Sequence, residues 1–224
     1  MIPWVLLDSA QVPGQGGELR LYQRDDEFSI RIVGRGELMN SRVHGSEEAL
    51  AELTCARLMN GPDPRLLIGG LGMGFSLAAA LQHVGDLAQV VVAELVPAVV
   101  AWNKGPLGEC AAFPLQDPRV TVREGDVSHI LKTEQGAYDA ILLDVDNGPE
   151  GLTRKKNNWL YSIDGLSAAY EALRPKGVLA VWSAGPAQDF LQRLRKLGFE
   201  VEEVCVRAHG SKGARHTIWL ARRE

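Results

Sequence analysis

The run Leu66-Leu67-Ile68-Gly69-Gly70-Leu71-Gly72-Met73-Gly74 decides the fold. Its apolar start predicts a buried strand, and its glycines predict a sharp turn whose backbone can approach a ligand because no Cβ stands in the way. A helix is expected to follow over residues 75–83. Strand, glycine turn and helix in this order favour a nucleotide-type binding site. A glycine turn that serves only compactness is the alternative.

Similar apolar runs recur along the chain and alternate with helical stretches. Short runs of this kind suit parallel strands that are buried on both faces. Strands are expected over residues 66–68, 90–93, 120–122, 140–143 and 178–182. Helices are expected over 75–83, 97–103, 127–132, 163–173 and 186–197. Right-handed crossovers would join these units into a doubly wound sheet.

The last two strands break the alternation. Residues 199–207 and 217–221 both read as strands, separated by a loop over 208–216 with no helix between them. This ending resembles the sheet of class I methyltransferases, in which the last strand is antiparallel. The resemblance predicts an α/β fold with a doubly wound, seven-stranded class I methyltransferase-like sheet.

The N-terminal part has a different pattern. Residues 18–23 and 28–33 alternate apolar and polar side chains around a polar turn, which predicts a hairpin. With residues 4–7 it would form a small β appendage, because a lone hairpin is marginally stable. Ser46 is then expected to cap a helix that runs to about Met59. We therefore divide the chain into an N-terminal β region, 1–43, and a Rossmann-like catalytic domain, 44–224.

Composition restricts the classes of function. The chain has 224 residues, 46% apolar content and a formal net charge of −4, so it has no global attraction for nucleic acid or anionic membranes. Its three widely spaced cysteines suggest neither a disulfide framework nor a metal site. The apolar run before Asp8 is too short for a signal peptide or a membrane span, which predicts a cytoplasmic protein.

Acidic residues follow the next two strands. Glu94, before Leu95, could accept both ribose hydroxyls of a nucleoside. The same pattern is used by NAD sites, but Phe75 stands where the NAD fingerprint has its third glycine. Asp126, before Val127, could accept a hydrogen bond from an adenine amino group or could simply cap a helix.

Two further acids end the fourth strand. Asp144 and Asp146 follow the apolar run 140–143. Ligands in open α/β sheets bind beyond the carboxyl ends of the strands, so both side chains should face the reactive end of the cofactor. A solvated turn is the alternative, since Asp, Asn, Gly and Pro favour turns.

Together these segments, from residue 44 to about 182, resemble spermidine synthases, the polyamine aminopropyltransferases. The resemblance implies a sulfonium cofactor, S-adenosylmethionine or its decarboxylated form, with S-adenosylhomocysteine or methylthioadenosine as product and no metal. It assigns the ribose to Glu94, the adenine to Asp126, and acceptor binding and proton acceptance to Asp144 and Asp146. His44 stands where that family has a glutamine that touches the cofactor. The implied cofactor-binding residues are Gly69, Gly70, Gly72, Gly74, Glu94, Leu95, Asp126, Val127 and His44.

The acceptor is expected to be a small molecule, possibly an amine, and neither nucleic acid nor a membrane. Glu150, Trp159 and Tyr161 are the candidate substrate residues. The resemblance also implies a homodimer, and the edge of the N-terminal hairpin could pair subunits.

Other functions stay open. An S-adenosylmethionine-dependent methyltransferase is the main alternative, because Gly72 stands where aminopropyltransferases usually carry an Asp that grips the cofactor's ammonium. The basic run Arg154-Lys155-Lys156 also favours it. A catalytically silent nucleoside-binding homologue is an alternative of another class. An NAD-dependent enzyme is a weaker option.

Overall fold

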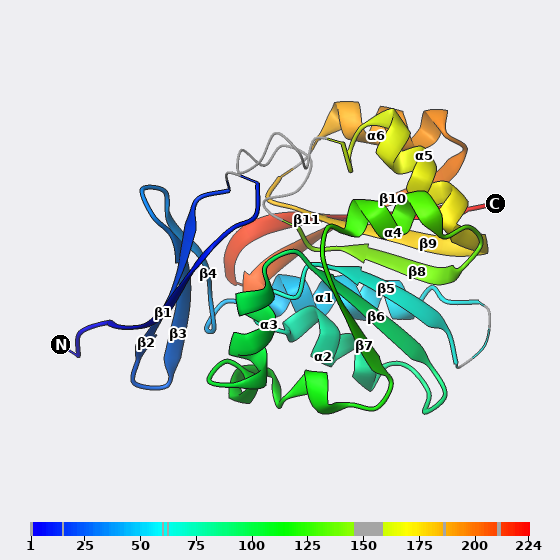
Figure 1. The fold of residues 1–224 in the computed structure, drawn as a ribbon. Helices are drawn as coiled ribbons and strands as arrows, with labels where there is room; N and C mark the ends of the chain where they lie inside the picture. The colour runs from blue at the N-terminus through cyan, green and yellow to red at the C-terminus, as the bar shows by residue number, and fades with distance from the viewer. Residues whose placement is uncertain are drawn as a thin grey trace.

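The structure is a computed structural model that describes residues 2–14, 16–59, 61, 63–145, 159–185, 187–209 and 212–224. The chain forms a large α/β unit and a smaller antiparallel sheet that stands at one end of it (Figure 1).

The central sheet has seven strands. They are β5 (Arg65–Gly69), β6 (Gln89–Glu94), β7 (Val120–Glu124), β8 (Tyr138–Leu143), β9 (Leu173–Ser183), β10 (Phe199–His209) and β11 (Lys212–Arg223). Their order is β10-β11-β9-β8-β5-β6-β7, and β11 is antiparallel to both of its neighbours. Leu67 in the central strand pairs with Val91 of β6 and with Ile141 of β8. The predicted doubly wound sheet with an antiparallel last strand is confirmed.

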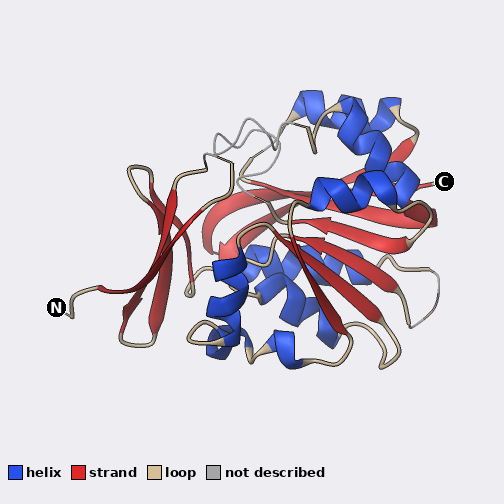
Figure 2. Cartoon of the chain, in the orientation of Figure 1, coloured by secondary structure: helices blue, strands red, loops and turns tan. Residues whose placement is uncertain are grey.

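Helices cover both faces of this sheet (Figure 2). One face carries α1 (Gly45–Cys55), α2 (Phe75–Gln82) and α3 (Pro97–Lys104), and the other carries α4 (Val127–Thr133), α5 (Ile163–Ala172) and α6 (Gln188–Lys196). The short 3-10 helices are η1 (Gly108–Ala111) and η2 (Pro114–Gln116). Leu66 and Ile68 pack into one hydrophobic cluster, and Leu67 between them packs into the other. Burial on both faces explains why these strands read as unbroken apolar runs.

The described α-helices have between 7 and 11 residues. None of them has the length and apolar character needed to cross a bilayer.

The N-terminal sheet consists of β1 (Val5–Gln11), β2 (Glu18–Arg24), β3 (Glu27–Ile32) and β4 (Gly36–Asn40). The predicted hairpin is β2 and β3, in which Leu21 lies opposite Ile30. Both side chains are buried and belong to the same hydrophobic cluster as α1, α2 and α3. A hydrogen bond reinforces this packing, because Trp102 of α3 donates Nε1–H to Asp8 Oδ2 of β1 at 2.7 Å.

The predicted cap of the first helix was wrong. His44, not Ser46, is the N-cap residue, and the helix ends at Cys55 rather than near Met59. Ser46 lies inside the first turn, where its hydroxyl donates to the Glu47 carboxylate at 2.6 Å. A serine can satisfy a local acceptor in place of capping, and the sequence does not distinguish these two uses.

Other boundaries also differ from expectation. The predicted loop over residues 208–216 is largely strand, because β10 continues to His209 and β11 starts at Lys212. The strand expected at 178–182 begins at Leu173, and α6 begins at Gln188. β4 was not anticipated as a separate strand. The extended last hairpin brings His216 beside Trp182, with ring centroids 4.7 Å apart.

The link between the two sheets can be measured with a double-mutant cycle. We expect Asp8→Ala and Trp102→Phe each to lower the free energy of unfolding, with a coupling of about 1 kcal/mol between them because they share one hydrogen bond. Urea unfolding of both single variants and the double variant tests this. Strictly additive energies would show that this bond does not hold the N-terminal sheet in place.

Candidate active site

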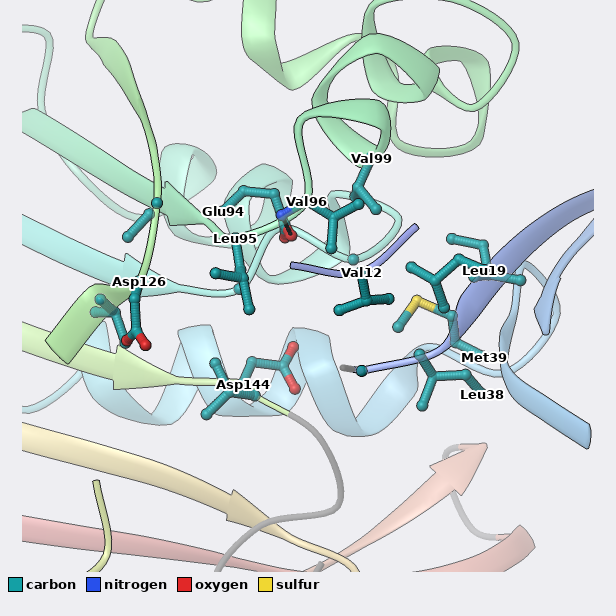
Figure 3. Close-up of a pocket in the computed structure, with 18 of the residues that line it drawn as sticks. Val12, Leu19, Leu38, Met39, Glu94, Leu95, Val96, Val99, Asp126 and Asp144 are labelled. Carbon is teal, nitrogen blue, oxygen red and sulfur yellow. Dashed lines mark hydrogen bonds between the residues drawn. The ribbon is translucent and has the colours of Figure 1, made fainter. Parts of the chain in front are cut away.

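A cleft lies between the two sheets, at the carboxyl ends of β5, β6, β7 and β8. Its volume is about 930 Å³, counted out to its open mouth. Polar groups from the central sheet face apolar side chains from the N-terminal sheet, among them Leu19, Leu38 and Met39 (Figure 3). The described chain therefore builds one wall from strand ends and the other from β2, β3 and β4.

Glu94 organises the inner wall. Its side chain is 7% exposed, and its two oxygens accept N–H groups from Leu71 at 2.9 Å and Val96 at 2.8 Å. Burial raises the pKa of Glu94, and the backbone N–H donors of residues 71, 96, 95 and 72 oppose that rise. Each carboxylate oxygen can accept more than one hydrogen bond, so Glu94 can hold the loop and still receive hydroxyl donors.

The glycine loop passes very close to the end of β8. Gly70 has φ +91°, and a Cβ at this position would lie 2.3 Å from the Asp144 carbonyl oxygen. Gly72 has φ +54° and borders the cleft, with Met39 Sδ 3.4 Å from where its Cβ would be. Gly74 is the N-cap of α2, with φ +87°. These positive φ angles explain why glycines open this helix.

The far end of the cleft is formed by the β7–α4 junction. Asp126 is the N-cap of α4 and accepts the Ser128 N–H at 2.9 Å, so the capping role is present. Asp126 and Val127 also line the cleft, as does Leu95. Val127 packs against Gly69, whose absent Cβ leaves room for it. Asp126 can therefore cap the helix with one oxygen and face a ligand with the other.

Asp144 lies where β8 ends, at the centre of the cleft. Its Oδ2 accepts the Ser76 hydroxyl at 2.8 Å. Burial and, secondly, the charge of Glu47 raise the pKa of Asp144 to about 7, and the Ser76 hydrogen bond opposes this rise. A carboxyl group with a pKa near neutrality can accept a proton at physiological pH.

A second cavity, of about 630 Å³, adjoins the first. Leu38, Met39, Gly72 and Asp144 line both cavities. The rest of the second wall includes Glu47, Ser76, Phe75 and Trp182. Asp144 therefore stands at the junction of a long, largely apolar cleft and a smaller cavity with a second acid.

Five of the sequence candidates lie outside both cavity walls in the described structure, namely Gly69, Gly74, His44, Trp159 and Tyr161. His44 stacks on Phe75 with ring centroids 4.3 Å apart, and its Nδ1 is 3.0 Å from Glu48 Oε1. Trp159 has Lys132 Nζ 4.2 Å from its ring centroid. Tyr161 is buried and donates its hydroxyl to the Val145 carbonyl at 3.1 Å. These contacts are structural ones.

Two further candidates, Asp146 and Glu150, lie outside the described residues, as does the basic run 154–156. Of the two acids expected to accept a proton, Asp144 is the one that lies in the described part.

Some site residues were missed by the sequence analysis. Glu47 read as part of a helix start, Ser76 as an ordinary helical residue, and His216 as a loop residue. Burial lowers the pKa of His216, and the charge of Glu47 opposes this shift. The His216 and Glu47 side chains are therefore close enough to interact electrostatically. To predict that Glu47 and His216 lie close together, one would have to know that β10 and β11 are joined by a short connection and that α1 packs against them.

The cleft fits an adenosyl group. The inner wall offers a carboxylate beside a loop without side chains, and the Asp126 carboxylate stands at its far end. The apolar side chains of Val96, Val99 and Leu95 provide surface for a flat ring. In the described residues no group of His, Cys, Asp or Glu side chains has the arrangement of a metal site.

Comparisons with known proteins agree with this geometry. The chain is 32% identical over 166 residues to a polyamine aminopropyltransferase of Oceanobacillus iheyensis, a match that covers 72% of this chain and 31% of the relative. It is 34% identical over 194 residues to putrescine N-methyltransferase 4 of Nicotiana tabacum, covering 79% of this chain and 48% of the relative. The chain thus spans less than half the length of either relative.

The fold has a solved counterpart. The spermidine synthase of Thermotoga maritima superposes with a TM-score of 0.78 at 17% identity, covering 98% of this chain and 73% of that one. No family model matches the sequence.

The contact between Gly70 and the Asp144 carbonyl gives a test of the site. We expect Gly70→Ala to lower the free energy of unfolding by about 2 kcal/mol or more and to weaken methylthioadenosine binding, because the new Cβ displaces either the loop or the end of β8. Gly136→Ala is the control, since Gly136 also has positive φ but open space around it. Thermal unfolding and titration calorimetry measure both effects. Equal binding by the two variants would contradict this account of the loop.

Proposed function

The chain belongs to the spermidine synthase-like family, which includes polyamine aminopropyltransferases and putrescine N-methyltransferases, and from this premise we propose that it transfers an alkyl group from an adenosyl sulfonium to a small amine. The observation that carries the proposal is the position of Asp144, at the junction of the two cavities and beside Glu47.

The adenosyl part is assigned to the larger cleft. Glu94 would receive the ribose hydroxyls, and Asp126 would receive the amino group of the base. Gly70 and Gly72 let the backbone approach without a side chain in between. S-Adenosylmethionine or its decarboxylated form would supply an alkyl carbon whose bond to the positively charged sulfur breaks as the acceptor nitrogen bonds to it, leaving a neutral thioether.

Asp144 supplies what the acceptor needs. An alkylamine is mostly protonated at neutral pH, since its ordinary pKa is near 10, and a protonated nitrogen has no free electron pair. A carboxylate at the junction can orient the ammonium and take its proton. Ser76 holds the Asp144 carboxylate at 2.8 Å, so its direction is fixed.

The identity of the transferred group is a finer question, and one observation favours methyl transfer. Gly72 has no side chain, and its neighbour across the cleft is the thioether of Met39. The loop position that could carry an acid to hold an aminopropyl ammonium therefore carries none. Methyl transfer from S-adenosylmethionine is our second candidate beside aminopropyl transfer.

Calorimetric titration distinguishes the candidate functions. We expect both sulfonium compounds, or their thioether products, to bind because the cleft fits the shared adenosyl group. Tighter binding of the decarboxylated form would support aminopropyl transfer, and tighter binding of S-adenosylmethionine would support methyl transfer. Binding of products without transfer to any of a panel of small amines would instead indicate a catalytically silent homologue. If no adenosyl compound binds, the proposal fails.

Asp144→Asn tests the proton acceptor. We expect the rate of transfer to fall by about 100-fold or more, with little change in methylthioadenosine binding, because the amide cannot take a proton. The wild-type rate should rise with pH through about 7, as the Asp144 carboxylate loses its proton, and then level off.

In Asp144→Asn this rise should disappear. Glu124→Gln is the control, because Glu124 is an exposed acid that ends β7, the edge strand of the same sheet. If Asp144→Asn keeps the wild-type rate and pH profile, Asp144 is not the base.

A further inference from the structure

The two cavities meet at a point where a branched ligand can enter both. Four residues, Leu38, Met39, Gly72 and Asp144, belong to both walls. A sulfonium carries three substituents, so when its adenosyl group occupies the larger cleft its tail can extend past Gly72 into the second cavity. Gly72 leaves this passage open because it has no side chain.

Glu47 is an acid of the second cavity that faces this passage from α1. Its carboxylate is held by the Ser46 hydroxyl at 2.6 Å. Its backbone carbonyl accepts a longer hydrogen bond, 3.3 Å, from the same Ser76 hydroxyl that donates to Asp144. Helix α1 is anchored by fully buried Leu50, so the carboxylate stands on a rigid element.

Among the residues that the structure describes, no lysine or arginine forms an ion pair with Glu47. Asp144 and His216 are close enough for the charge of Glu47 to act on both, and Glu48 of the same helix is paired with His44. Two acids that border one cavity repel each other unless a cation lies between them.

Two buried nitrogens in the same region also lack partners. Trp182 Nε1 and His216 Nδ1 are shielded from solvent without a hydrogen bond in the described structure. Trp182 lines the second cavity and contacts His216. Buried polar atoms without partners are costly in a native fold. The Trp182 N–H can only donate, so it calls for an acceptor, such as the carboxylate on an amino acid tail.

From this arrangement we infer that Glu47 is a specificity-determining residue that binds the ammonium on the tail of the sulfonium donor in the second cavity. This inference rests on the proposed function. The aminopropyl tail of the decarboxylated donor and the amino acid tail of S-adenosylmethionine both end in an ammonium, so Glu47 would serve either form. It places the recognition of the donor tail on α1 and not on the glycine loop.

The test compares a donor with a ligand that lacks the tail ammonium. Methylthioadenosine keeps the adenosyl thioether and has no ammonium. We expect Glu47→Gln to weaken binding of the preferred sulfonium donor by about tenfold, the loss of one charge-assisted contact, while methylthioadenosine binding changes less than about twofold. Titration calorimetry near pH 8, above the pKa of about 7 of Asp144, measures both constants.

Two further variants make the result specific. Glu52→Gln is the matched control, since Glu52 lies on the same helix and is exposed. It should leave both constants unchanged. Gly72→Asp added to Glu47→Gln should recover donor binding, because it restores an acid to the same cavity. Asp tolerates positive φ better than most residues, and its Cβ would meet only the flexible Met39 side chain at 3.4 Å.

The outcomes separate this inference from the proposed function. If the wild-type protein binds neither sulfonium donor nor methylthioadenosine, the proposed function fails. If methylthioadenosine binds but Glu47→Gln leaves the ratio of donor to methylthioadenosine affinity unchanged, only the role of Glu47 is overturned. Loss of both affinities in equal proportion would also overturn it, since that result shows a structural role.

Discussion

The site depends on one buried carboxylate. Glu94 ends β6, yet its oxygens bind backbone N–H groups on both sides of the cleft floor, from Leu71 in the glycine loop and from Val96 before α3. A buried charge without such donors would be strongly destabilising. With them, the carboxylate fixes the path of the glycine loop together with the buried side chains of Leu71 and Met73. The position of Gly70 against Asp144, and so the geometry of the junction, follows from this constraint.

Glu94 and Asp144 have different surroundings, and this suits them to different roles. Glu94 has backbone donors that favour its charged form, whereas Asp144, within the described residues, receives the Ser76 hydroxyl and faces the charge of Glu47. The same residue type can therefore serve as a fixed support in one place and as a proton acceptor in another. Helix α1 contributes to this difference because it brings Glu47 to the end of β8.

The sequence predicted the features that depend on local pattern. The apolar runs at residues 66–68 and 90–93 identified the central strands, and the glycines and Glu94 identified the cleft. It could not predict that Ser46 supports Glu47 in place of capping α1, or that His216 lies on a strand against Trp182. These contacts join residues that are far apart in the chain, and periodicity carries no information about which helix crosses which strand. Tyr161 shows the same limit, since an aromatic residue after a loop can equally be a core anchor, and here it is buried outside the two cavity walls.

Both sheets line the cleft, so ligand binding and the docking of the N-terminal sheet are thermodynamically linked. Leu19, Leu38 and Met39 come from the N-terminal sheet, while Glu94 and Asp144 come from the central one. A compound that contacts both sheets binds only when they are docked, so its binding free energy adds to the docking of the N-terminal sheet. At a concentration about 100 times its dissociation constant, this linkage amounts to about 2.7 kcal/mol. In a cell the occupancy of the cleft would thus set how often the first forty residues detach, and the supply of ligand would protect this chain from proteolysis.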